Sequence, residues 1–281
     1  MKDFYLATFR TVREYMLPYL TDFERFSESL TNPVEGVERG SNIQYAFDLE
    51  ADAIVKARIE EAGLEGRVFS EESGFYTVGT KNKYRIVFDP FCNSTLASRG
   101  MLDSACGITV FSWDYEVQAS GILDYQTGVV AYCELGKSTE LFSIATGVPI
   151  PSQGSSTTKL EDAWVALKLE NREERANLQS VDGVFRGAKR LLVGSGHIYW
   201  LRLALGTIDA YIVPTRGQKL YEMFAASVAQ GAGCIVSDVS GEIFDPGKYL
   251  KIFEENPAYR YYPVAARNQV LHAELMAKGT V

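Results

Sequence analysis

The sequence of 281 residues predicts an α/β protein in which helices and sheets pack in layers. Two observations carry this prediction. The first 150 residues place two amphipathic helical patterns ahead of a series of strand patterns, which is typical of helices packed on an antiparallel sheet. The later residues alternate strand and helix patterns, which favours a layered α/β arrangement. A proline-, glycine- and serine-rich run at 149–156 separates the two patterns, so we expect subdomains at 1–150 and 151–281.

In the first subdomain, apolar residues at helical spacing predict helices at Asp3–Leu20 and Asp48–Ala62, with a long polar loop over Thr21–Asn42 between them. Turn residues at 124–128 join the last two expected strands into a hairpin. The expected strands are Val68–Ser70, Tyr84–Phe88, Ala105–Phe111, Val117–Leu123 and Val129–Leu135.

In the second subdomain, strand and helix patterns follow one another. The expected strands are Trp164–Leu169, Arg190–Val193, Ala210–Val213, Ile235–Ser237 and Tyr262–Ala266. The expected helices are Glu173–Ser180, His197–Leu205, Leu220–Gln230 and Asn268–Lys278.

Composition excludes several classes of function. The net charge is −8 and no run is rich in lysine or arginine, which argues against sequence-independent nucleic-acid binding. No apolar stretch approaches the roughly 20 residues of a membrane span, and the first residues lack the apolar core of a signal peptide. The four cysteines are scattered without a CxxC pair, so we expect a reducing, cytoplasmic compartment.

The residues that most strongly indicate a functional site lie in the stretch from Val87 to Thr95. Pro90 has no N–H for a sheet ladder, so we expect the preceding strand to end with Asp89 at its carboxyl end. The small polar residues from Asn93 onward then turn the chain, and Glu71-Glu72 form a second acidic pair upstream. Hard cations such as Mg²⁺ take carboxylate oxygens together with substrate phosphates. The pattern therefore indicates a cation site beside a phosphate cradle, with an ordinary polar strand end as the alternative.

The order of these acids resembles the inositol monophosphatase family, which belongs to the wider lithium-sensitive, metal-dependent phosphatase group that includes fructose-1,6-bisphosphatase. The family pattern is E-E-S/T, then D-P-x-D-G-S/T, then W-D followed by A-G-G. This chain has Glu71-Glu72-Ser73, Asp89-Pro90-Phe91-Cys92-Asn93-Ser94, and Leu220-Tyr221-Glu222 ahead of Ala232-Gly233-Cys234. The resemblance spans nearly the whole chain and implies the family's αβαβα layered sandwich.

The resemblance also implies roles for individual residues. Glu71, Asp89 and the Phe91 carbonyl match the first metal site of the family, and Asp89 would bridge to a second ion. Asp48 and Ser94 occupy the positions that orient the attacking water. For Asp48, a helix-capping role is the alternative, since it stands at the start of an expected helix.

Phosphate binding is implied for the turn Cys92-Asn93-Ser94, whose backbone N–H groups suit an anion. It is also implied for Gly194-Ser195-Gly196, where the family's substrate loop lies. His197 follows that loop, and it is expected either to contact substrate or to face solvent as a cap residue. His272 is expected in a packing or surface position, whereas Cys106, Cys133 and Cys234 are expected in the core. A cysteine-phosphatase loop starting at Cys92 is disfavoured, because six residues rather than five separate it from Arg99.

This chain departs from the family pattern at two positions of the second metal site. Cys92 replaces a family acid, and a neutral thiol is a poor Mg²⁺ ligand. The W-D acid falls on Tyr221 in an ungapped comparison and on Glu222 if one residue is deleted. We expect Glu222, not Tyr221, to point into the cleft and to serve as the ligand.

The expected function is Mg²⁺-dependent hydrolysis of a small polyol or sugar phosphate, with Mn²⁺ as an alternative cofactor and a homodimer as the implied assembly. The alternative function is that of a non-catalytic member of the family, which binds a phosphorylated ligand or a partner without hydrolysing it. The loss of a carboxylate at Cys92 motivates this second hypothesis.

Overall fold

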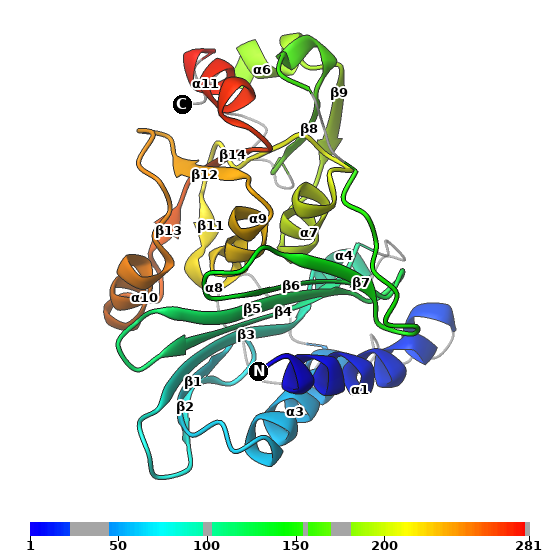
Figure 1. The fold of residues 1–281 in the computed structure, drawn as a ribbon, viewed down its shortest axis with the longest axis vertical. Helices are drawn as coiled ribbons and strands as arrows, with labels where there is room; N and C mark the ends of the chain where they lie inside the picture. Colours follow the sequence, from blue (N-terminus) through cyan, green and yellow to red (C-terminus); the bar gives the residue numbers. More distant parts are fainter. Residues whose placement is uncertain (23–44, 98–102, 154–156, 170–180, 279–281) are drawn as a thin grey trace.

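A computed structural model describes residues 1–22, 45–97, 103–153, 157–169 and 181–278. Most of the loop expected at Thr21–Asn42 and the whole helix expected at Glu173–Ser180 lie outside these residues. Within them, two sheets and three sets of helices stack in five layers, α, β, α, β, α (Figure 1). The expected layered α/β sandwich is confirmed.

The first layer consists of α1 (Lys2–Thr21) and α3 (Ala46–Glu61), which lie side by side on one face of the larger sheet (Figure 1). Buried residues on α1 recur at helical spacing, as at Phe9, Val12 and Met16, and they face this sheet. The Tyr5 hydroxyl donates to the carbonyl of Ala119 at 2.9 Å and fixes α1 against the sheet.

The larger sheet has seven strands in the order β2-β1-β3-β4-β5-β6-β7. All neighbours are antiparallel except β1 and β3, which run parallel, so the expectation of a purely antiparallel sheet is wrong for this pair. The edge strands β2 and β7 were not expected from the sequence. The strands are β1 Gly66–Ser70, β2 Gly74–Val78, β3 Tyr84–Cys92, β4 Ala105–Ser112, β5 Val117–Asp124, β6 Val129–Glu134 and β7 Glu140–Ser143.

Strand β3 does not end before Pro90, and that expectation is wrong. Its ladder with β4 pairs Asp89 with Gly107 and resumes at Cys92 with Ala105, so β3 carries an irregularity between them. A proline is tolerated at such a bulge, because the ladder needs no N–H donor at that position. The carbonyl of Pro90 accepts a hydrogen bond from the Tyr125 hydroxyl. The bulge leaves both Asp89 and Cys92 buried on the same strand.

The middle layer contains α7 (His197–Leu205), α8 (Leu220–Met223) and α9 (Ala226–Gly231), and it lies between the two sheets (Figure 1). The single helix expected at Leu220–Gln230 is thus divided in two. One core cluster joins this layer to both sheets, with Phe111 and Phe224 in edge contact at 5.3 Å and Trp200 against Tyr211 at 4.9 Å. This shared core fixes α7 and α8 against the face of β3 and β4.

The smaller sheet has five strands in the order β12-β14-β10-β8-β9, and a separate ribbon pairs β11 with β13. The outer helices α6 and α11 cover the far face of the smaller sheet (Figure 1). The strands are β8 Trp164–Leu167, β9 Arg190–Val193, β10 Ala210–Ile212, β11 Gln218–Lys219, β12 Ile235–Asp238, β13 Arg260–Tyr261 and β14 Pro263–Ala266. The remaining helices are α4 Ser94–Ala97, η1 Leu160–Asp162, α6 Asp182–Gly187, α10 Pro246–Glu255 and α11 Gln269–Ala277.

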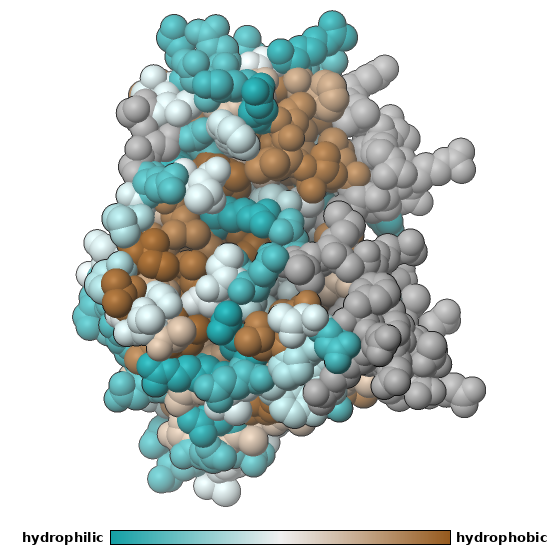
Figure 2. All heavy atoms as spheres, turned by 90° about the vertical axis from the view of Figure 1, so that its right-hand side faces the viewer, coloured by the Kyte–Doolittle hydropathy of each residue, from teal (hydrophilic) through white to brown (hydrophobic). Residues whose placement is uncertain are grey.

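On the face shown in Figure 2, hydrophobic side chains gather in the upper half, at the height of the smaller sheet. Exposed apolar residues of that sheet include Trp164 and Val193. Across the described ranges, no helix combines the length and apolar character needed to cross a bilayer. The division at residues 150 and 151 stays a prediction.

Candidate functional site

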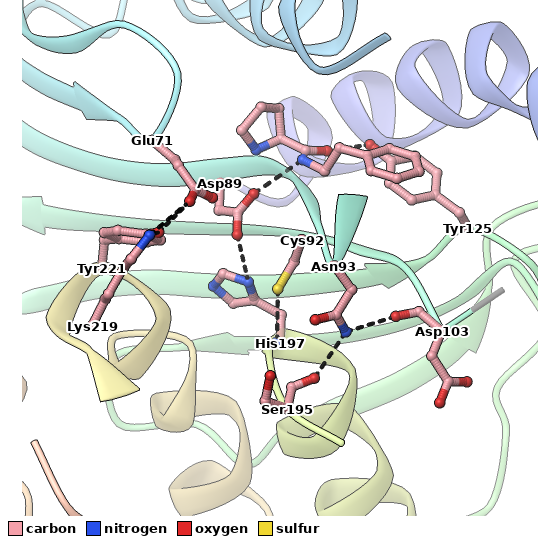
Figure 3. A network of polar contacts seen from close by, with 12 residues as sticks. Glu71, Asp89, Cys92, Asn93, Asp103, Tyr125, Ser195, His197, Lys219 and Tyr221 are labelled. Atoms are coloured by element: carbon pink, nitrogen blue, oxygen red, sulfur yellow. Dashed lines mark hydrogen bonds and ion pairs between the residues drawn. The ribbon is translucent and has the colours of Figure 1, made fainter. Parts of the chain in front are cut away.

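Five elements bring polar side chains together beneath the carboxyl end of β3 (Figure 3). Asp89 and Cys92 come from β3, and Glu71 comes from the turn after β1. The second half of the chain adds His197 from the start of α7, together with Lys219 of β11 and Tyr221 of α8. Glu71 and Asp89 therefore lie together with His197 and Tyr221, and Lys219, for which no place in the site was expected, joins them.

Asp48 occupies the third position of α3 rather than its cap. Its Oδ2 accepts from the Tyr45 N–H at 3.1 Å, so the capping role is present. Its Oδ1 is buried and has no hydrogen-bond partner among the described residues. Burial, and then the charge of Glu72, raise the pKa of Asp48, and the charges of Glu71 and Asp89 add to this effect. Asp48 is therefore part of a crowded group of acids.

Glu71 is held by two groups of the protein. The Tyr221 hydroxyl donates to its Oε1, and the Lys219 ammonium lies 3.2 Å from the same oxygen (Figure 3). Lys219 also donates to the Tyr221 hydroxyl at 2.6 Å. Burial, and then the charge of Asp89, raise the pKa of Glu71, while Lys219 opposes that rise. One face of this carboxylate is thus already neutralised from within the chain.

The expectation that Tyr221 points away from the cleft is wrong, because its hydroxyl reaches Glu71. Glu222 also lies nearby. Its charge contributes to the raised pKa of both Glu71 and Cys92, and its Oε2 is buried without a partner among the described residues. Both residues of the uncertain motif therefore border the site. Whether Glu222 ligates a metal stays a prediction.

His197 lies in the interior, with 1% of its surface exposed, so the expectation of a solvent-facing cap residue is wrong. Its Nδ1 is 3.4 Å from Asp89 Oδ2, and its backbone N–H donates to Cys92 Sγ at 3.4 Å. Burial, and then the charge of Asp89, raise the pKa of the Cys92 thiol. The sequence placed His197 beside the substrate loop but gave no sign of the direction in which its ring points.

The two expected phosphate loops meet through Asn93. This residue has a φ of 70°, in the left-handed region that asparagine tolerates well. Its side-chain amide donates to the carbonyls of Asp103 and Ser195, each at 2.8 Å (Figure 3). Gly196 approaches so closely that a Cβ there would lie 2.4 Å from Cys92 Sγ. Ser94 begins α4 at the edge of this junction and is partly exposed.

Phe91 is buried between aromatic rings, with Phe47 on one side at 4.8 Å and Tyr125 stacked on the other at 5.0 Å. Its backbone N–H donates to Asp89 Oδ1 at 3.1 Å. This contact orients the Asp89 carboxylate so that Oδ2 faces His197. A metal-binding role for the Phe91 carbonyl stays a prediction.

The donor set does not fit a pair of Mg²⁺ ions. Mg²⁺ prefers oxygen ligands in octahedral geometry. Here one oxygen of Glu71 already contacts an ammonium and a phenol, and a thiol and an imidazole lie beside Asp89. Nitrogen and sulfur donors favour softer metals instead.

Comparison with known proteins gives no sequence-level match: neither a protein-family model nor a curated protein matches this sequence. Solved structures do match. The extragenic suppressor protein SuhB from Bartonella henselae is 17% identical with a TM-score of 0.76, over 99% of this chain and 97% of that chain. An inositol monophosphatase from Thermotoga maritima is 14% identical with a TM-score of 0.72, over 98% and 95%.

Inositol monophosphatase II from Staphylococcus aureus is similar at 14% identity and a TM-score of 0.71, over 99% of this chain and 95% of that chain. Identities this low establish the fold alone, since one fold hosts many functions. Along nearly its whole length, the chain has the fold of the inositol monophosphatases.

Proposed function

We propose that this protein binds a small phosphorylated polyol or sugar at the junction of the Asn93 turn and the Gly194–Gly196 loop, and does not hydrolyse it by the Mg²⁺-dependent route of inositol monophosphatases. One observation carries the proposal: Lys219 and Tyr221 both contact the Glu71 oxygen that a first cation would need. A fixed ammonium neutralises charge, but it cannot coordinate and activate a water as a metal does. The thiol at Cys92 removes a further carboxylate ligand.

The ligand class follows from the fold and from the loops. Structures of the Staphylococcus aureus enzyme contain inositol monophosphate or 2′-AMP, so its version of the fold accepts phosphate monoesters. In this chain, the Asn93 amide joins the two loops that would surround a phosphate. Lys219 supplies a positive charge beside Glu71, with 25% of its side chain exposed.

Hydrolysis with another metal is the second candidate. It is favoured by the buried, unpartnered oxygens of Asp48 and Glu222, because buried carboxylates without partners are costly unless a cation compensates them. In that case Asp48 and Ser94 would orient the attacking water, as the resemblance implies.

One assay separates the two candidates. Phosphate release is measured from inositol 1-phosphate, fructose 1,6-bisphosphate and 2′-AMP in EDTA, Mg²⁺, Mn²⁺ and Zn²⁺, and binding is followed by calorimetry and thermal shift. We expect binding of at least one ester without release in Mg²⁺. Release in Mg²⁺ that disappears in Glu71→Gln but persists in Glu61→Gln, an exposed acid on α3, would overturn the proposal. A panel in which nothing binds would also overturn it.

We also infer a homodimer and a reducing, cytoplasmic compartment. The resemblance supports the first, and the four unpaired cysteines agree with the second. Sedimentation at micromolar concentration tests the assembly.

A further inference from the structure

We propose that Asp89, Cys92 and His197 form a binding site for one transition-metal ion, with Zn²⁺ as the best match. Among the described residues, this is the group whose carboxylate, thiol and imidazole donors lie within 4.8 Å of one another. The proposal concerns metal binding alone, so it stands or falls independently of phosphate recognition.

The spacing suits a tetrahedral ion. Bonds of about 2.0–2.1 Å from zinc to nitrogen and oxygen place two such ligands roughly 3.3 Å apart at the tetrahedral angle. Asp89 Oδ2 and His197 Nδ1 are 3.4 Å apart. The third donor, Cys92 Sγ, would reach the same metal position after a side-chain adjustment, since all three donor atoms lie within 4.8 Å of one another.

Two buried atoms that have no hydrogen-bond partner among the described residues, Asp89 Oδ2 and His197 Nδ1, are independent evidence for an ion. Asp89 and His197 each have 1% of their surface exposed. Asp89 Oδ2 and His197 Nδ1 both lack a hydrogen-bond partner in the described part of the chain, although they face each other. Buried polar atoms are satisfied in the large majority of cases, so a pair of neighbouring exceptions needs an explanation. A metal ion between them would satisfy both.

The surroundings orient each ligand. The Phe91 N–H binds Asp89 Oδ1 and leaves Oδ2 for the site, while the His197 N–H points at Cys92 Sγ and would stabilise a thiolate. The His197 ring lies against Gly107, where a Cβ would be only 2.3 Å from its Cδ2. Outer partners of this kind fix ligand orientation in metal sites.

The donor chemistry selects the metal. Thiolate and imidazole suit Zn²⁺, whereas Mg²⁺ prefers oxygen alone. Three protein ligands would leave a fourth position open to water or to an oxygen of a bound ester, as in zinc sites with an open position. Binding displaces the thiol proton to solvent, so the metal gains a charged sulfur and no oxidant or reductant is needed.

The test is metal content of the intact protein. The chain is stripped with chelator, incubated with Zn²⁺ or Co²⁺ in the presence of excess Mg²⁺, desalted, and measured by elemental analysis. We expect one Zn²⁺ per chain and, with Co²⁺, a thiolate-to-metal charge-transfer band. Cys92→Ser and His197→Ala should each weaken Zn²⁺ binding by more than the roughly 10–100-fold that loss of an outer partner costs.

The matched controls are Cys234→Ser and His272→Gln, which alter a buried cysteine and a buried histidine away from the site. Both should retain zinc binding and the cobalt band. Circular dichroism and thermal unfolding check that each variant folds, and the Zn²⁺-induced rise in Tm gives a second measure of binding. Wild-type protein that binds no zinc, or Cys92→Ser that keeps full affinity and the charge-transfer band, would overturn the proposal.

Discussion

Gly107 lies directly opposite Asp89 in the β3–β4 ladder, and the ring of His197 occupies the space that a side chain at position 107 would need. The absent Cβ therefore lets a histidine from the second half of the chain approach an aspartate of the first. This arrangement makes Gly107 a positioning residue for the site.

Gly107→Ala should destabilise the protein by about 1–3 kcal/mol, because the added methyl group overpacks against the His197 ring. Most of that cost should vanish in a His197→Ala background, where the ring is gone. The measurement is urea unfolding of both single variants and the double variant. Additive effects would show that the contact with His197 is not what excludes a side chain at position 107.

Lys219→Met should make the protein depend on added cations. Without the ammonium, Glu71 keeps only the Tyr221 hydroxyl from the pair that now holds its Oε1, and burial of its charge becomes costlier. We expect a lower Tm in EDTA than for wild type, with a larger rise on adding Mg²⁺. Lys219→Arg retains the charge and serves as the control. Equal responses of the Met and Arg variants to Mg²⁺ would contradict a cation-like role for Lys219.

Asp48→Asn should stabilise the metal-free protein at neutral and higher pH. The pKa of Asp48 is raised by burial and by neighbouring acids. Its stabilising protonated form is fully present below the unfolded-state pKa and is lost as pH rises through the folded-state pKa. The asparagine has no such loss, so the difference in unfolding free energy between variant and wild type should grow from pH 4 to pH 8. A difference that is constant with pH would rule out this origin.

Cys92→Asp should shift metal preference from Zn²⁺ toward Mg²⁺. A carboxylate supplies a full negative charge and a hard oxygen, whereas the thiolate favours softer metals. We expect weaker Zn²⁺ binding, and phosphate release that appears or rises in Mg²⁺. A contact that stabilises developing charge is commonly worth about 2.7–4 kcal/mol, so partial recovery should be measurable. Cys92→Asn is the uncharged control. A folded Cys92→Asp variant that binds Zn²⁺ as tightly as wild type, or that binds Mg²⁺ no more tightly, would contradict this account.

The sequence was sufficient for the elements that local patterns determine. Apolar spacing located α1 and α3, and the hairpin of β5 and β6 followed from its turn residues. The end of β3 was misplaced because Pro90 weakens a strand locally, whereas the bulge that accommodates it depends on pairing with β4. Pairing with β4 therefore determines the structure at Pro90 more strongly than the local effect of proline does.

The site was likewise predictable only where local sequence patterns locate its residues. Glu71 and Asp89 stand in a recognisable order, so their convergence could be expected. Lys219 and the direction of the His197 ring could not, because both depend on how β11 and α7 pack against β3 across more than a hundred residues. The one available signal for Lys219 was its position two residues before Tyr221, next to a motif that was already expected to border the site.

The contact between Cys92 and His197 joins positions 105 residues apart in the chain. A site of this kind cannot exist in a nascent first half, and it closes only after β3 and α7 have docked. Contacts so distant in sequence slow folding, because a long loop must be ordered before they form. An ion held there would bind only once this contact has formed, so it would slow unfolding far more than it speeds folding. The lifetime of the folded protein would then depend on its metal supply.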